Sequence, residues 1–164
     1  MTARQVIGVL SFRKNIFLLD EFENLFASLF DKDEVYIDIM RVIATSRYGI
    51  AQETLFSKLD EATKGIGGLK KLKALEKSDF IMSFKPHFHK KKGIHYKVID
   101  EYTLFYFYWI EPIKNSLLKK GLRTGYWEQI KLKASWKSWS GYAFEAICYK
   151  HLAQVGDALK LSPT

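Results

Sequence analysis

The stretch 48–100 changes the spacing of its apolar residues once, and this change constrains the fold more than any other feature of the chain. Apolar residues first recur at helical spacing, over 51–59 and again over 69–77, on either side of the glycine-rich EATKGIGG. Beyond Ser78, two β-rich stretches follow, FIMSFKPHF and IHYKVID, joined by HKKKG. Pro86 favours an edge position for the first of these strands. Two helices around a tight turn, followed by a hairpin, are typical of a winged helix-turn-helix.

Two more helices are predicted before this unit. Apolar residues at helical spacing over 16–30 indicate an amphipathic helix with an aromatic face. The acidic cluster DKDE ends that helix and can cap the next one, which is predicted over 35–46. Gly49 would end this second helix in the left-handed conformation that favours glycine.

The part of the chain after the hairpin is predicted to be mostly helical. Residues 101–120 form an unusually aromatic helix that Pro112 bends or breaks. Aromatic residues on all its sides indicate burial on several sides, whereas stacking of nucleic-acid bases is disfavoured because no basic residues interleave. Residues 121–140 are expected to be looser, and 142–155 to be helical with Cys148 as a buried thiol. The apolar stripe of this last helix comprises Phe144, Ile147, Cys148, Leu152 and Val155.

The predicted fold class is therefore mainly α. It has a winged helix-turn-helix core with one small β-hairpin sheet, flanked by N- and C-terminal helices. We divide the chain into an N-terminal helical segment (1–34), the winged helix-turn-helix (35–100), the aromatic helix with its connector (101–140) and a last helical segment (141–164).

Composition and charge limit the class of protein. In 164 residues, 48% are hydrophobic, which predicts a globular chain. The net charge of +8 favours an anionic partner, of which nucleic acid is the commonest, and a soluble basic protein is the alternative. A single cysteine suits a reducing compartment, and neither a secretory signal nor a membrane-spanning run is evident. We therefore expect a cytoplasmic protein.

Lysines dominate the candidate winged helix, with ten lysines against two acids from Lys64 to Lys97. On the third helix of the unit, the leucines form one arc and three lysines group within about 60° on the opposite side. A lysine is a point charge, so phosphate contacts with little base specificity are expected. The alternative is a solvated face with a charged edge strand. The candidate DNA-binding residues are Lys70, Lys71, Lys73, Lys77 and, at the hairpin tip, Lys90, Lys91 and Lys92.

Neither a metal site nor a catalytic site follows from the residues. His87, His89 and His95 could approach one another across the hairpin, but no carboxylate or cysteine completes a tetrahedral set and the nearby lysines disfavour a cation. The glycines at 65–68 lack the preceding strand and the GK[ST] ending of a phosphate-binding loop. No nucleophile–base arrangement can be argued from spacing. We therefore expect no cofactor, no metal and no enzymatic activity.

The order of several motifs resembles the C-terminal half of prokaryotic AAA-like P-loop ATPases. These motifs are EFENLFASLF, GIGGLKKLKALEKSDFI, HYKVIDEYTLFYFYWIEP and WSGYAFEAIC. The resemblance implies that 1–34 is the end of an ATPase lid, that the winged helix follows, and that 141–164 is the first helix of a PD-(D/E)XK nuclease-like domain. Glu145 matches the acid on that helix. The family's Walker motifs would precede Met1 and its remaining nuclease acids would follow Thr164, so the chain is expected to be a middle-to-late segment.

Two functions follow as hypotheses. The first is a non-catalytic module that binds duplex DNA through phosphate contacts. The alternative is a protein–protein or interdomain module of an AAA-like ATPase, or one that self-associates, because the aromatic residues of 16–30 and 102–109 exceed the needs of a small domain.

Overall fold

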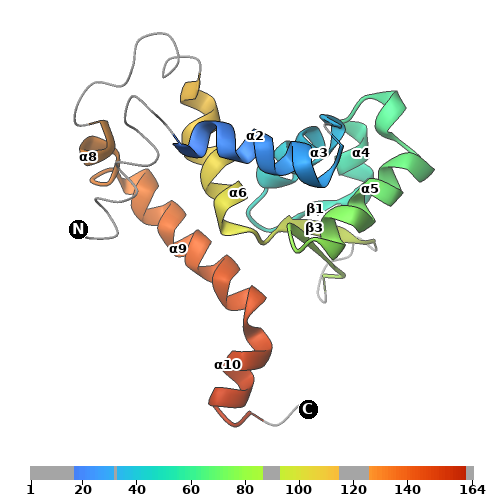
Figure 1. Ribbon diagram of the computed structural model, residues 1–164. Coiled ribbons are helices and arrows are strands. Elements are labelled where there is room, and N and C mark those ends of the chain that lie inside the picture. Colours follow the sequence, from blue (N-terminus) through green and yellow to red (C-terminus); the bar gives the residue numbers. More distant parts are fainter. Residues whose placement is uncertain (1–16, 32, 87–92, 115–125, 162–164) are drawn as a thin grey trace.

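The computed structural model of the chain describes residues 17–31, 33–86, 93–114 and 126–161 (Figure 1). The helices before the hairpin are α2 (Phe17–Leu29), α3 (Val35–Ala44), α4 (Gln52–Ser57), the 3-10 turn η1 (Glu61–Thr63) and α5 (Ile66–Lys77). The strands are β1 (Ile50–Ala51), β2 (Ile81–Phe84) and β3 (His95–Val98). The later helices are α6 (Glu101–Phe105), the π-helical η2 (Tyr106–Ile110), the 3-10 turn η3 (Glu111–Ile113), α8 (Tyr126–Ile130), α9 (Ala134–Lys150) and α10 (Leu152–Ala158).

The elements from α3 to β3 form a winged helix. They follow in the order α3, β1, α4, α5, β2, β3, and the antiparallel sheet has the strand order β1-β3-β2. Strand β3 is central, with Tyr96 opposite both Ile50 and Ser83. Strand β2 lies at the sheet edge, as Pro86 predicted. The mainly helical fold with a small hairpin sheet is therefore confirmed.

The sheet has one strand more than the sequence predicted. Ala51 was expected to begin a helix, but Ile50 and Ala51 form β1 and pair with β3. Two residues are too few to show an alternating pattern, so periodicity could not reveal this strand.

The end of α3 also differs from the prediction. The helix ends at Ala44 rather than at residue 46, and Gly49 lies in the turn that leads into β1. Its φ of +86° is left-handed as expected, and the Ser46 hydroxyl donates to the Gly49 carbonyl at 2.7 Å. A side chain at position 49 would meet the Phe84 ring at 2.8 Å. Glycine is thus required by the turn rather than by a helix end.

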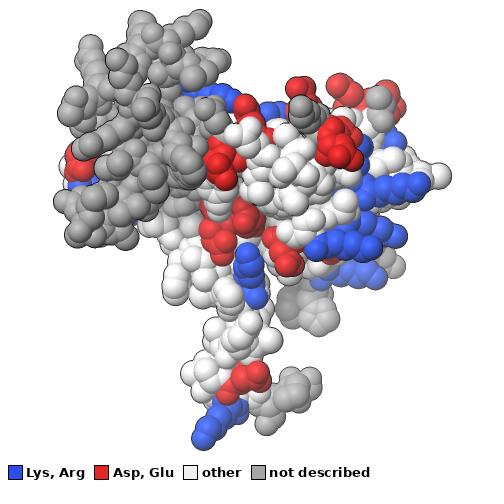
Figure 2. Space-filling model, viewed as in Figure 1, with Lys and Arg blue, Asp and Glu red and all other residues white. Residues whose placement is uncertain are grey.

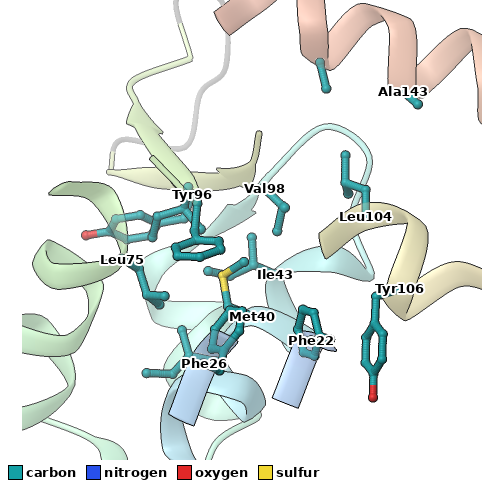
Figure 3. Packing of buried hydrophobic residues seen from close by; sticks show 14 of the residues in the cluster. Phe22, Phe26, Met40, Ile43, Leu75, Tyr96, Val98, Leu104, Tyr106 and Ala143 are labelled. Carbon is teal, nitrogen blue, oxygen red and sulfur yellow. The ribbon is translucent and has the colours of Figure 1, made fainter. Parts of the chain in front are cut away.

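The hydrophobic core joins α2, α3, α5, the sheet and the aromatic helix (Figure 3). Phe22 of α2 stacks on Tyr106 of η2 with ring centroids 3.8 Å apart, and both side chains are buried. On another side, Phe105 packs edge-on against Trp139 of α9 at 5.8 Å. The prediction that the aromatic helix is buried on several sides is confirmed, and its partners are α2 and α9.

The C-terminal helices correct two predictions. Helix α9 begins at Ala134, inside the segment expected to be loose, and the helical run is interrupted at His151. The expected buried stripe is largely exposed, because the face that packs on the body consists of Trp139, Tyr142, Ala143 and Ala146. Cys148 is only half-buried. The exposed apolar side chains of α9 and α10 are Phe144, Ile147, Tyr149, Leu152 and Val155.

Gly68 allows α5 to approach the segment before it. A Cβ at this position would overlap the Thr63 carbonyl oxygen and lie 2.8 Å from the Phe56 ring, whereas a Cβ on the neighbouring Gly67 would meet nothing within 4 Å. The two glycines share a helix but differ in their surroundings.

Gly68→Ala should therefore lower the free energy of unfolding by about 1–3 kcal/mol, because the backbone of η1 must move. Gly67→Ala is the matched control, and better helix propensity should leave it neutral or stabilise it by about 0.5–1 kcal/mol. Chemical denaturation of both variants measures the difference. Equal stabilities would contradict the close approach.

Candidate nucleic-acid interface

Helix α5 is held with one face in the core. Gly65, with a φ of +78°, turns the chain into the helix. Leu72 and Leu75 are fully buried, and they fix the rotation of the helix about its axis. Leu69, which was expected on the same buried arc, is partly exposed near the start of the helix. The opposite face of α5 is therefore turned to solvent.

Three lysines occupy that solvent face. Lys70, Lys73 and Lys77 are exposed, and none forms an ion pair with another residue of the described structure. Their spacing of three and four residues places them along one side of the helix. Figure 2 shows Lys and Arg side chains gathered on the part of the surface where α5 lies. We call Lys70, Lys73 and Lys77 the lysine face.

Lys71 differs from its neighbours although the sequence grouped it with them. Its ammonium pairs with the Asp33 carboxylate and lies 4.7 Å from the centre of the Tyr36 ring. The hydrogen bond from Lys71 lowers the pKa of Asp33 below its ordinary value. Lys71 thus connects α5 to the turn between α2 and α3. A run of adjacent lysines does not reveal which one meets an acid distant in sequence.

The rest of the predicted sites can be placed only in part. Lys90, Lys91 and Lys92 lie outside the described residues, as do His87 and His89. His95 lies in β3, with its ring 5.7 Å from that of Phe84. Among the residues that the structure describes, no group of three histidine, cysteine, aspartate or glutamate side chains could hold a metal ion.

Sequence reasoning missed a buried lysine on the wing strand. Lys97 of β3 is only 5% exposed, and its ammonium lies 3.3 Å from a carboxylate oxygen of Glu145 on α9. The same ammonium lies 4.4 Å from the centre of the Tyr149 ring and 5.3 Å from that of Tyr142. Burial raises the pKa of Tyr142 to about 12, so its ring remains neutral beside the lysine. Glu145, which the resemblance matched to an acid of a nuclease-like domain, therefore forms an ion pair with Lys97.

Acidic residues gather around a cavity on the N-terminal helices. This cavity, of about 390 Å³ between α2, α3 and η2, is lined by carboxylates together with Arg41. These carboxylates belong to Glu23, Asp33, Glu34, Asp38 and Glu111. Most of these carboxylates are neutralised within the fold, since Glu23 pairs with Lys114, Asp33 with Lys71, and Asp38 and Glu111 with Arg41.

No helix among the described residues combines the length and apolar character needed to cross a lipid bilayer.

Comparison with known proteins adds little to this geometry. No protein-family model matches the sequence, and no curated protein matches it. Among solved structures, the chain is similar to an uncharacterized SlyA-like transcription regulator from Listeria monocytogenes, at 20% identity and a TM-score of 0.38. The match covers 92% of this chain and 94% of that chain. Because the superposition is loose, the winged-helix assignment depends on the topology described above.

The ion pair between Lys97 and Glu145 can be tested by changing either partner. Glu145→Gln leaves the buried ammonium without its counter-ion and should lower the free energy of unfolding by about 1–3 kcal/mol. Lys97→Met should cost less, because methionine fills a similar volume and the remaining carboxylate is half-exposed. Thermal and urea denaturation compare the two variants. A Glu145→Gln protein as stable as the wild type would contradict the role of the pair.

Proposed function

We propose that this chain is a non-catalytic winged-helix module that binds duplex DNA through phosphate contacts, in the cytoplasm and with little sequence specificity. The lysine face of α5 carries the proposal, because it supplies exposed cations on the second helix of a helix-turn-helix, and none of them has an acidic partner in the part of the chain that the structure describes. Lys90, Lys91 and Lys92 would add phosphate contacts from the hairpin, and Lys71 is excluded from the interface because it pairs with Asp33.

The chemistry of the lysine face suits a backbone contact. Ammonium groups attract phosphate oxygens but lack the planar fork with which arginine reads guanine. The lysine face is exposed and attracts the phosphate backbone, so the molecule would approach DNA with α5 first. Such binding releases counter-ions and therefore weakens steeply with added salt.

Replacing the lysine face should remove most of the affinity for DNA. We expect Lys70→Gln/Lys73→Gln/Lys77→Gln to weaken binding to a random-sequence duplex by at least about tenfold at low salt. It should also reduce the slope of log affinity against log salt by about 2–3, near one per lost phosphate contact. Fluorescence anisotropy at several salt concentrations measures both quantities.

Lys71→Gln is the control for this experiment. This variant removes a cation from the same helix, but that cation pairs with Asp33 and is not expected to contact DNA. The free energy of unfolding should therefore fall, while the slope of log affinity against log salt should stay unchanged. Absence of duplex binding by the wild type at low salt would rule out the proposal. If Lys71→Gln and the triple variant lost the same amount of affinity for DNA, binding would depend on net charge and not on the position of the lysines.

A second candidate function is an interaction module of an AAA-like ATPase, in keeping with the resemblance of the motifs. The exposed apolar side chains of α9 and α10 favour it, with Phe144 65% and Leu152 57% exposed. Figure 1 shows α10 projecting away from the winged helix, so no described element covers this face. Apolar groups left in water in this way are typical of a contact surface.

This candidate predicts concentration-dependent association. Light scattering coupled to size exclusion should show a larger mass for the wild type at high concentration, and Phe144→Glu/Leu152→Glu should remain monomeric with an unchanged melting temperature. Leu132→Glu, at a residue that is 76% exposed but lies before α9, is the control and should behave as the wild type. A wild type that stays monomeric at all concentrations would leave self-association without support.

A further inference from the structure

A second cavity lies away from the lysine face, where the end of α3, the π-helical η2 and the first half of α9 meet. Its volume is about 290 Å³, at the small end of the range of about 300–1,000 Å³ for ligand sites. Its walls combine two guanidinium groups with four aromatic rings. These residues are Arg41, Arg47, Phe107, Tyr108, Trp139 and Tyr142.

The two arginines have different electrostatic roles. Arg41 is neutralised, because its Nε and Nη2 donate to Glu111 Oε1 at 3.0 and 2.9 Å. Arg47 has no acidic partner within the described structure, since its Nη1 donates to the neutral Ser138 hydroxyl at 3.0 Å. Its guanidinium lies 5.6 Å from the centre of the Tyr142 ring. Arg41 also pairs with Asp38, and the Glu111 carboxylate itself lines the cavity. Arg47 is therefore the guanidinium of the cavity wall that no carboxylate of the described residues contacts.

The aromatic walls come from two helices. Phe107 and Tyr108 belong to the π-helical turn η2, and Tyr108 is 45% exposed. Trp139 and Tyr142 of α9 are mostly buried, so only limited parts of their rings contact the cavity. A π-helical turn is rare, and such turns occur frequently at functional sites. Here the turn places two consecutive aromatic residues on one cavity.

We propose that this cavity binds a small molecule with a planar aromatic ring and one anionic group. The ring would pack against Tyr108 and the parts of Trp139 and Tyr142 that contact the cavity, and the anion would accept hydrogen bonds from Arg47. Both an aromatic carboxylate and a nucleoside monophosphate have this chemistry. The site is separate from the lysine face, so it does not depend on DNA binding.

Calorimetric titration of the whole chain with matched probes tests the proposal. Benzoate should bind at least about tenfold more tightly than neutral benzamide, because benzamide cannot pair with Arg47. Benzoate should also bind more tightly than acetate, which has no ring. It should bind more tightly than cyclohexanecarboxylate as well, because the ring of that probe is not planar. Adenosine monophosphate distinguishes a nucleotide ligand from an aromatic carboxylate. If it binds more tightly than benzoate, the site is assigned to nucleotides, and if it binds more weakly, the site is assigned to aromatic carboxylates.

Variants assign the binding to this cavity. Arg47→Gln should weaken benzoate binding by about tenfold, and Tyr108→Ala by several-fold; both side chains are exposed, so the fold should persist. Lys137→Gln removes one exposed cation from α9 outside the cavity and should retain the wild-type affinity. Circular dichroism confirms that each variant is folded. No binding of any anionic aromatic probe, equal affinities for benzoate and benzamide, or an unchanged affinity in folded Arg47→Gln would overturn the proposal.

Discussion

The burial of strand β3 on both of its faces is the constraint on which the rest of the structure depends. Successive side chains of a strand point to opposite faces of the sheet. Tyr96 and Val98 join the core formed with α2, α3 and α5, while Lys97 contacts α9 from the other face. Strand β3 also pairs with both β1 and β2, so it joins the parts of the winged helix and, through Lys97, adds a contact to α9. A lysine is tolerated there because Glu145 and two tyrosine rings surround its charge.

The lysines of this chain fall into at least two groups: some pair with acids within the fold, and others are exposed to solvent. Lys71 and Lys97 connect elements that are distant in sequence, through Asp33 and Glu145. The lysine face has no such partners among the described residues, so its charge is available to an external anion. The number of lysines thus overstates the cations available for binding, because Lys71 and Lys97 are paired within the fold, whereas the net charge of +8 already counts the acids that pair with them.

The sequence was sufficient for the order of the main elements around the winged helix. Helix α2 was predicted within one residue at each end, and the change to a hairpin after Ser78 was correct, because both depend on local periodicity. Features that depend on distant contacts could not be predicted. Strand β1 forms only against β3, and Lys71 turns away from the lysine face only because Asp33 is near. On α9, large aliphatic residues suggested the buried face, whereas small Ala143 and Ala146 allow the close approach.

The candidate site was predictable only in its chemistry. Charge segregation on α5 identified Lys70, Lys73 and Lys77, but neither the engaged Glu145 nor the cavity beside Arg47 could be derived from spacing. The π-helical turn has a geometric consequence for the side chains that follow it. A π turn holds one more residue than an α turn, so it corresponds to a single-residue insertion in the helix that spans Glu101 to Ile110. Without that extra residue the helix would be regular and Glu111 would be rotated away from Arg41, so the cavity depends on the length of this helix as well as on its residue types.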